Sequence, residues 1–200
     1  MAALGARIEL TNALLREVIA AQGWAAPASG RLHLYGVRGA VPVSHDTLVV
    51  NQNLPDQYND AMGCFGSYLS AYKATTDPGA HFTRHPSNKQ GAAHLRPGDW
   101  RYKRGLHKGR KALVQAAPVS VRRDRDRDAK PEDNEPIDTG WFGINHHAGG
   151  MKPDVGAWSA GCQVIWGGYG GEPWLDYLHW IYEVFPQSEY HYYLLNAGWF

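Results

Sequence analysis

The chain has 200 residues, with 20 Lys and Arg against 19 Asp and Glu, for a formal net charge of +1. This balance excludes the strongly basic composition typical of nucleic-acid-binding proteins, and a hydrophobic share of 44% excludes a chain that is disordered by charge. Two cysteines cannot form a disulfide framework, and no run of about 18 apolar residues is present to cross a bilayer. We therefore expect neither a nucleic-acid partner nor membrane insertion.

The N-terminal segment combines a capping residue with apolar positions at helical spacing. Thr11 suits the N-cap of a helix, and Gly23 suits its end. The spacing predicts a packed helix over about 11–22. Its apolar face is formed by Leu14, Leu15, Val18 and Ile19.

The following segments alternate apolar and polar residues in short runs bounded by glycine and proline, which is typical of strands. A last apolar set at helical spacing, between Pro173 and Pro186, predicts a helix that covers the sheet. The predicted fold is mainly β with peripheral helices, a β-rich α+β domain. Strands are expected within 31–39, 46–50, 67–76, 97–102, 111–123, 141–147, 162–166 and 190–196.

One segment of high charge interrupts this pattern. Residues 122–136 read RRDRDRDAKPEDNEP, with five basic and six acidic side chains and almost no apolar residue. Near-balanced runs of this kind are usually solvated connections, so we predict a charged surface loop at about 122–136. No internal repeat or long linker divides the chain, and residues 1–200 are expected to form a single catalytic domain.

The residues with chemical potential gather between Gly140 and Gly168. A histidine pair, His146 and His147, ends a predicted strand, and Cys162 opens the next one. A catalytic thiol needs a neighbouring imidazole as base and main-chain N–H groups that hold an oxyanion. From the residues alone, a buried hydrophobic cysteine and a structural or metal-binding histidine pair remain alternatives.

The same segment resembles the signature of the L,D-transpeptidase catalytic domain of the YkuD type. That signature is a strand ending in histidine, a glycine-containing loop and then Ser-x-Gly-Cys, here His147, Ser159, Gly161 and Cys162. The resemblance implies an L,D-transpeptidase-like mixed β-sheet domain. It also implies that Cys162 is the nucleophile, that His147 is the base, and that Ser159 orients the histidine or orders the turn.

The resemblance further implies that the main chain of Gly161 and Cys162 forms the oxyanion hole. As a nucleophile, Cys162 is expected to have a pKa below that of free cysteine. Cys64 has no matching histidine and is expected to be a packed or surface thiol. Six further residues are expected at the substrate cleft, with His81 as a weaker candidate: Asn145, His146, Trp158, Gln163, His107 and Tyr102.

The implied function is a cysteine-dependent hydrolase of peptidoglycan stem peptides that forms an acyl-enzyme on Cys162. Alternatives are an L,D-transpeptidase or L,D-carboxypeptidase in wall maintenance, and a non-catalytic wall-binding or structural module. No cofactor or metal is expected, because no tight set of zinc ligands stands out in the sequence.

The N-terminal residues lack the pattern of a basic patch, an apolar core and a small-residue cleavage site, so we expect no signal peptide. We therefore expect synthesis in the cytoplasm and action in the periplasm or on the cell wall after lysis or secretion. This route suits a phage lysin or a secreted antibacterial effector, whose partners would be a holin, secretion machinery or an immunity protein.

Overall fold

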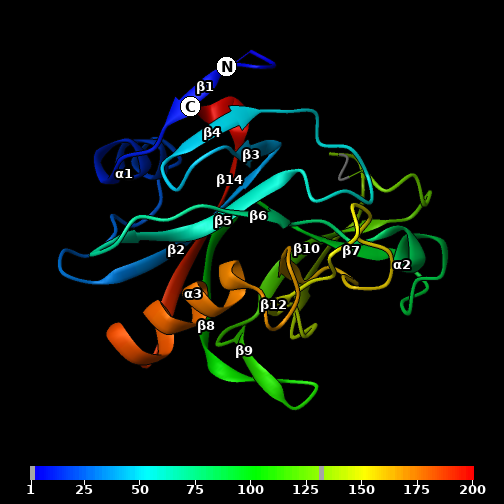
Figure 1. Cartoon of the computed structure of the whole chain (residues 1–200). Helices are drawn as coiled ribbons and strands as arrows, with labels where there is room; N and C mark the ends of the chain where they lie inside the picture. Colours follow the sequence, from blue (N-terminus) through cyan, green and yellow to red (C-terminus); the bar gives the residue numbers. More distant parts are fainter. Residues whose placement is uncertain (1–2, 131–132) are drawn as a thin grey trace.

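Eight strands close into a barrel-like sheet, shown with the rest of the chain in Figure 1. The computed structural model describes residues 3–130 and 133–200. The helices are α1 (Asn12–Ala21), α2 (Ala80–Arg84) and α3 (Glu172–His179), the last continued by a π-helix (Trp180–Val184), and a 3-10 turn (Ala197–Trp199) ends the chain. The strands are β1 (Arg7–Glu9), β2 (Leu32–Arg38), β3 (Ala40–Pro42), β4 (Thr47–Val50), β5 (Asp60–Gly66), β6 (Tyr72–Thr75), β7 (Ala92–Leu95), β8 (Gly98–His107), β9 (Arg110–Gln115), β10 (Val119–Asp124), β11 (Ile137–Gly140), β12 (His146–Ala148), β13 (Gln163–Ile165) and β14 (Tyr190–Asn196).

The barrel has the strand order β12-β13-β6-β5-β2-β14-β8-β9 and closes through β9 and β12. Two of its pairs are parallel, β2 with β14 and β12 with β13, and the others are antiparallel. Two three-stranded sheets flank it, with the orders β1-β4-β3 and β11-β10-β7. A mainly β fold with few short helices is therefore confirmed.

Strand β2 is buried along its whole length because both of its faces are covered. Leu34 belongs to the core of the barrel, whereas Tyr35 belongs to a second core on the other face, beneath α1. Leu15 and Ile19 of α1 fill that second core. Thr11 accepts a hydrogen bond at Oγ1 from the main-chain N–H of Leu14 (3.0 Å), which is the cap expected for this helix.

Aromatic side chains fill much of the barrel core. Tyr102 and Tyr192 lie with their ring centroids 5.6 Å apart, and α3 adds Trp174 and Tyr177 to the same cluster. Such large rings bury extensive apolar area and fix the packing of the strands around them. Within the described residues, no helix has both the length and the apolar composition that crossing a membrane requires.

The strand predicted for 141–147 is wrong in its first half, because β12 begins only at His146. Gly143 has a φ of +70°, which breaks the extended backbone. The main-chain N–H groups of Phe142 and Ile144 both donate to Oε1 of Gln115, at 3.0 and 2.9 Å. The Gln115 side chain therefore accepts the hydrogen bonds that a neighbouring strand would otherwise accept from this segment.

The loop predicted for 122–136 also needs correction. Its first three residues belong to β10, and Arg123, Asp124 and Glu135 are buried. Arg123 forms an ion pair with Asp138 of β11 (2.8 Å), which explains how its charge is accommodated. Residues 131 and 132 of the predicted loop lie outside the described residues. The segment is thus a connection with buried ends rather than a wholly solvated loop.

Candidate active site

The parallel register of β12 and β13 brings the histidine and the cysteine together. His147 pairs with Val164, and Gln163 donates its main-chain N–H to Asn145 O (2.9 Å). Side chains alternate between the faces of a strand, so His147 and Val164 share one face with Cys162. His146 and Gln163 point to the opposite face, into the barrel core.

Cys162 lies at the bottom of a tight turn, with 8% of its surface exposed. Its sulfur contacts two main-chain groups, accepting from Asn145 N–H and donating to Gly143 O, each at 3.5 Å. Gly161 has a φ of +126°, and a Cβ there would lie 2.4 Å from Ala93 O. The position before the cysteine therefore requires glycine.

Ser159 forms hydrogen bonds with the main chain of this turn and none with a histidine side chain among the described residues. Its buried hydroxyl donates to Cys162 O (2.8 Å) and accepts from the main-chain N–H of Gly161 (3.1 Å). Of the two expected roles, the structure thus places Ser159 in ordering the turn. The N–H of Gly161, one of the two donors expected in the oxyanion hole, is bonded to Ser159 in this structure.

The ring of His147 is held in one tautomer. Its Nδ1 lies 2.8 Å from the carbonyl oxygen of Ala148, and a carbonyl only accepts, so Nδ1 carries the proton. Nε2 of the neutral ring is then free to accept a proton. Burial lowers the pKa of His147 to about 4, against the opposing effect of the bond to Ala148, so the ring is neutral at physiological pH.

A second histidine, from the end of β8, lies against the first. The rings of His107 and His147 stack with centroids 4.7 Å apart and an interplanar angle of 10°. Asn145 donates from Nδ2 to His107 Nδ1 (2.9 Å), which leaves the proton of the neutral ring on Nε2. Burial and then Lys108 lower the pKa of His107, so this ring is a neutral N–H donor beside a neutral acceptor.

One ligand-type atom of each of His107, His147 and Cys162 lies within 4.8 Å of the other two. This group can act as a nucleophile with its base, because small movements bring the thiol to an imidazole nitrogen. Two imidazoles and a thiolate are also ligands that zinc accepts. The structure therefore assembles a candidate metal site that the sequence pattern does not reveal.

Burial, opposed by the N–H of Asn145 and by Lys108, raises the pKa of the Cys162 thiol. This corrects the expectation of a pKa below that of free cysteine. No protonated imidazole stabilises a thiolate here, because the ring of His147 is neutral. The resting pair is a neutral thiol beside a neutral imidazole, and proton transfer must accompany attack on a substrate.

Three of the residues expected at the cleft lie in the interior instead. His146, Gln163 and Tyr102 are fully buried. His146 Nδ1 lies 2.9 Å from Tyr177 Oη, and Tyr192 donates to Gln163 Oε1 (2.8 Å). These residues cannot contact a substrate, because their side chains follow the inward face of the strands.

The remaining expected residues are more dispersed. The Asn145 side chain contacts His107, whereas Trp158 is 44% exposed in the loop between β12 and β13. His81 lies on α2, with its ring edge-on to Phe82 and tilted against His85, and is not part of the histidine–cysteine group. Cys64 is buried in the barrel core, where burial raises the pKa of its thiol well above the usual value, and both cysteines are free.

Three supporting residues were not predicted from the sequence. Gln115 fixes the segment before β12, as described above. Tyr58 accepts at its hydroxyl from Gly150 N–H (3.0 Å), which holds the loop after β12. Lys108 follows His107 in the β8–β9 turn. Its position next to His107 in the sequence is the one signal that could have placed it near the site. No pattern in the sequence identifies Gln115 or Tyr58.

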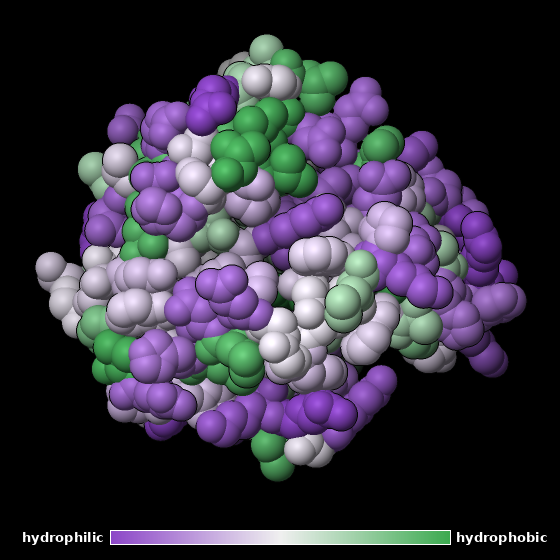
Figure 2. Space-filling model, in the orientation of Figure 1, coloured by the Kyte–Doolittle hydropathy of each residue, from purple (hydrophilic) through white to green (hydrophobic). Residues whose placement is uncertain are grey.

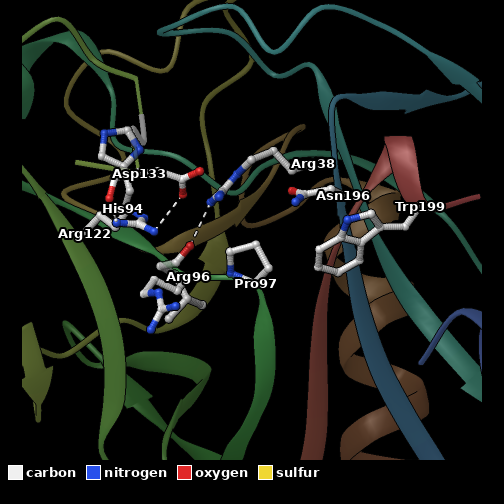
Figure 3. Close-up of a pocket in the computed structure, with 9 residues that line it drawn as sticks. Arg38, His94, Arg96, Pro97, Arg122, Asp133, Asn196 and Trp199 are labelled. Atoms are coloured by element: carbon white, nitrogen blue, oxygen red, sulfur yellow. Dashed lines mark hydrogen bonds and ion pairs between the residues drawn. The ribbon is translucent and has the colours of Figure 1, made fainter. Parts of the chain in front are cut away.

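The cavity shown in Figure 3 has a volume of about 330 Å³ and is lined by residues other than the histidine–cysteine group. Arg38 reaches into it and forms an ion pair with the buried Asp77 (3.0 Å). His94 binds the same carboxylate through Nδ1 (2.9 Å). On the outer side, Arg122 pairs with Asp133 (2.8 Å). The arginines of this cavity are thus largely engaged in holding the fold.

Comparison of the chain with protein-family models, with curated proteins and with solved structures finds no match.

Proposed function

We propose that this protein is a cysteine-dependent hydrolase of peptidoglycan stem peptides, built on an L,D-transpeptidase-like domain. The observation that carries the proposal is the Cys162 thiol within 4.8 Å of nitrogen atoms of His147 and His107. The substrate class rests on the resemblance of the segment from His147 to Cys162 to the L,D-transpeptidase signature.

In the first step, Nε2 of His147 takes the thiol proton as the sulfur of Cys162 attacks the carbonyl carbon of the scissile peptide bond. A C–S bond forms, and the carbonyl electron pair moves onto oxygen. When the C–N bond breaks, the imidazolium returns its proton to the departing amine. The product is a thioester on Cys162 and a released amine.

In the second step, His147 removes a proton from a water molecule that attacks the thioester. The C–S bond breaks, the thiol regains a proton and the acid is released. An amine in place of water would give transpeptidation. The Nε2–H of His107, oriented by Asn145, is the donor that we assign to the developing oxyanion, because the N–H of Gly161 is engaged.

The proposed setting is a phage lysin or a secreted antibacterial effector that acts on the cell wall. A holin, secretion machinery or an immunity protein would be its partners in that setting. An L,D-transpeptidase or L,D-carboxypeptidase of wall maintenance is the alternative with the same residues. A wall-binding module is the non-catalytic alternative, in which Cys162 does not react.

A zinc-dependent hydrolase is the second candidate, because the same three residues are suitable zinc ligands. Analysis of the purified protein for zinc distinguishes the two mechanisms. The cysteine mechanism predicts less than stoichiometric zinc and full turnover with a zinc-selective chelator. Stoichiometric zinc, with loss on chelation and recovery on readdition, would favour the metal hydrolase.

The test of function is the digestion of purified peptidoglycan, with released fragments identified by mass spectrometry. Cys162→Ala should release no fragments while remaining folded, because it deletes the nucleophile and little volume. Cys64→Ser is the matched control, which should retain most activity once its folded fraction is measured by circular dichroism. Equal fragment release by the wild type and Cys162→Ala would refute the proposal.

A further inference from the structure

The connection after β10 places three carboxylates together. Asp124 ends β10, and Asp126 and Asp128 follow at alternate positions. One oxygen atom of each lies within 4.8 Å of an oxygen of the other two. They lie on the side of the molecule where β7 and β10 run, and hydrophilic side chains dominate that side in Figure 2.

Asp124 is the inner member of this group, with 0% of its surface exposed. The main-chain N–H of Ala129 donates to its Oδ2 (3.2 Å), and His94 Nε2 lies 4.0 Å from the same oxygen. Its Oδ1 is buried and has no hydrogen-bond partner among the described residues. A buried carboxylate oxygen is costly without a donor or a cation, and a cation held among the three carboxylates would provide the missing contact.

The spacing of the acidic residues matches the ligand order of a calcium-binding loop. Such loops take side-chain oxygen ligands from their first, third, fifth and twelfth residues. With Asp124 as the first residue, Asp126 and Asp128 are the third and fifth, and Glu135 is the twelfth. Glu135 is buried and lines, with Asp126, a cavity of about 160 Å³. The sixth residue, Ala129, has a φ of +66°, at the place where such loops turn sharply.

We infer that Asp124, Asp126 and Asp128 bind one Ca²⁺. All three supply hard carboxylate oxygens, whereas zinc prefers nitrogen and sulfur. An irregular loop suits the flexible coordination of Ca²⁺ better than the strict octahedron of Mg²⁺. Lys130 Nζ lies 3.2 Å from Asp128 Oδ2 in a pair that is exposed on the lysine side, so the ammonium can move away when the cation binds.

The calcium site would brace the strand that supports the nucleophile turn. Asp124 pairs with Ala92 across β10 and β7, and the neighbouring Ala93 carbonyl packs against Gly161. Fixing the end of β10 therefore restricts movement of β7 beside Cys162. This inference does not depend on the proposed reaction, since binding and stability report it directly.

The test is calorimetric titration of chelator-treated, desalted full-length protein with CaCl₂, and with MgCl₂ at the same ionic strength. The wild type should bind one Ca²⁺ saturably, with a Tm that rises as the Ca²⁺ concentration passes Kd. Asp126→Ala should raise Kd by about tenfold or more, because it removes an exposed ligand, which also accepts from the main-chain N–H of Asp128 (3.2 Å). Asp133→Ala, which removes the same charge from the same connection, should leave Kd within about twofold.

A wild-type titration without saturable heat would overturn the inference. Saturation by Mg²⁺ at equal concentrations would overturn the assignment to calcium. Equal weakening by Asp126→Ala and Asp133→Ala would overturn the ligand set, because it would show a response to net charge alone. Circular dichroism of both variants confirms that each is folded when titrated.

Discussion

Folding stability should fall between pH 6.5 and 4 because His147 is buried as a neutral ring. Its pKa is about 4 in the folded protein, against 6.5 for a histidine in an unfolded chain. The unfolded chain therefore binds a proton in this interval that the folded protein does not, so acid favours unfolding. The stability is fully present above pH 6.5 and is lost as pH falls toward 4. The shift of 2.5 corresponds to a loss of about 3 kcal/mol at pH 4.

The assay is urea denaturation at a series of pH values for the wild type and His147→Gln, which cannot titrate. The quantity compared is the difference in unfolding free energy between pH 7 and pH 4. The pKa of His146 is lowered as well, first by burial, which both proteins retain, and then by the charge of His147, which only the wild type has. The wild type should lose about 3 kcal/mol more than His147→Gln. Equal losses would refute a buried neutral His147.

Three further outcomes follow from the site. His147→Gln should lower peptidoglycan turnover by about two or more powers of ten. His146→Gln should lower the turnover per folded molecule far less. The reverse ranking would assign the base to His146. Gly161→Ala should lower the free energy of unfolding, measured by thermal unfolding, by about 2 kcal/mol or more, because residue 161 has a positive φ and a Cβ there would lie against the Ala93 carbonyl. A variant as stable as the wild type would contradict the turn geometry. Alkylation of Cys162 by iodoacetamide should rise with pH toward a midpoint above that of free cysteine, about 8.5, and a midpoint well below it would show a stabilised thiolate.

The face on which each histidine lies follows from sequence because β12 and β13 are regular at that point. Alternation along the strand separates His147 from His146, and the structure places only His147 beside Cys162. The contact with His107 could not be derived in the same way. It depends on the pairing of β8 with β9 and on the bond to Asn145, which join residues far apart in the chain.

Composition alone does not distinguish an interior tyrosine from one in a cleft. Tyr102 was expected at the cleft, but the closure of the barrel places it in the core against Tyr192. The charged run predicts a solvated loop, because charged side chains usually lie at the surface. Pairing of β10 with both β7 and β11 buries Arg123 and Asp124 at its start, and that pairing is a long-range property.

The central claim is tested most directly by looking for the acyl-enzyme itself. Wild-type protein is incubated with purified stem peptides, quenched in acid, and analysed by intact-mass and peptide-mapping mass spectrometry. The account predicts an added mass equal to the acyl part of the stem peptide, located on Cys162, removed by hydroxylamine and absent from Cys162→Ala. Peptide cleavage that proceeds in Cys162→Ala, with no adduct on the wild type, would contradict it.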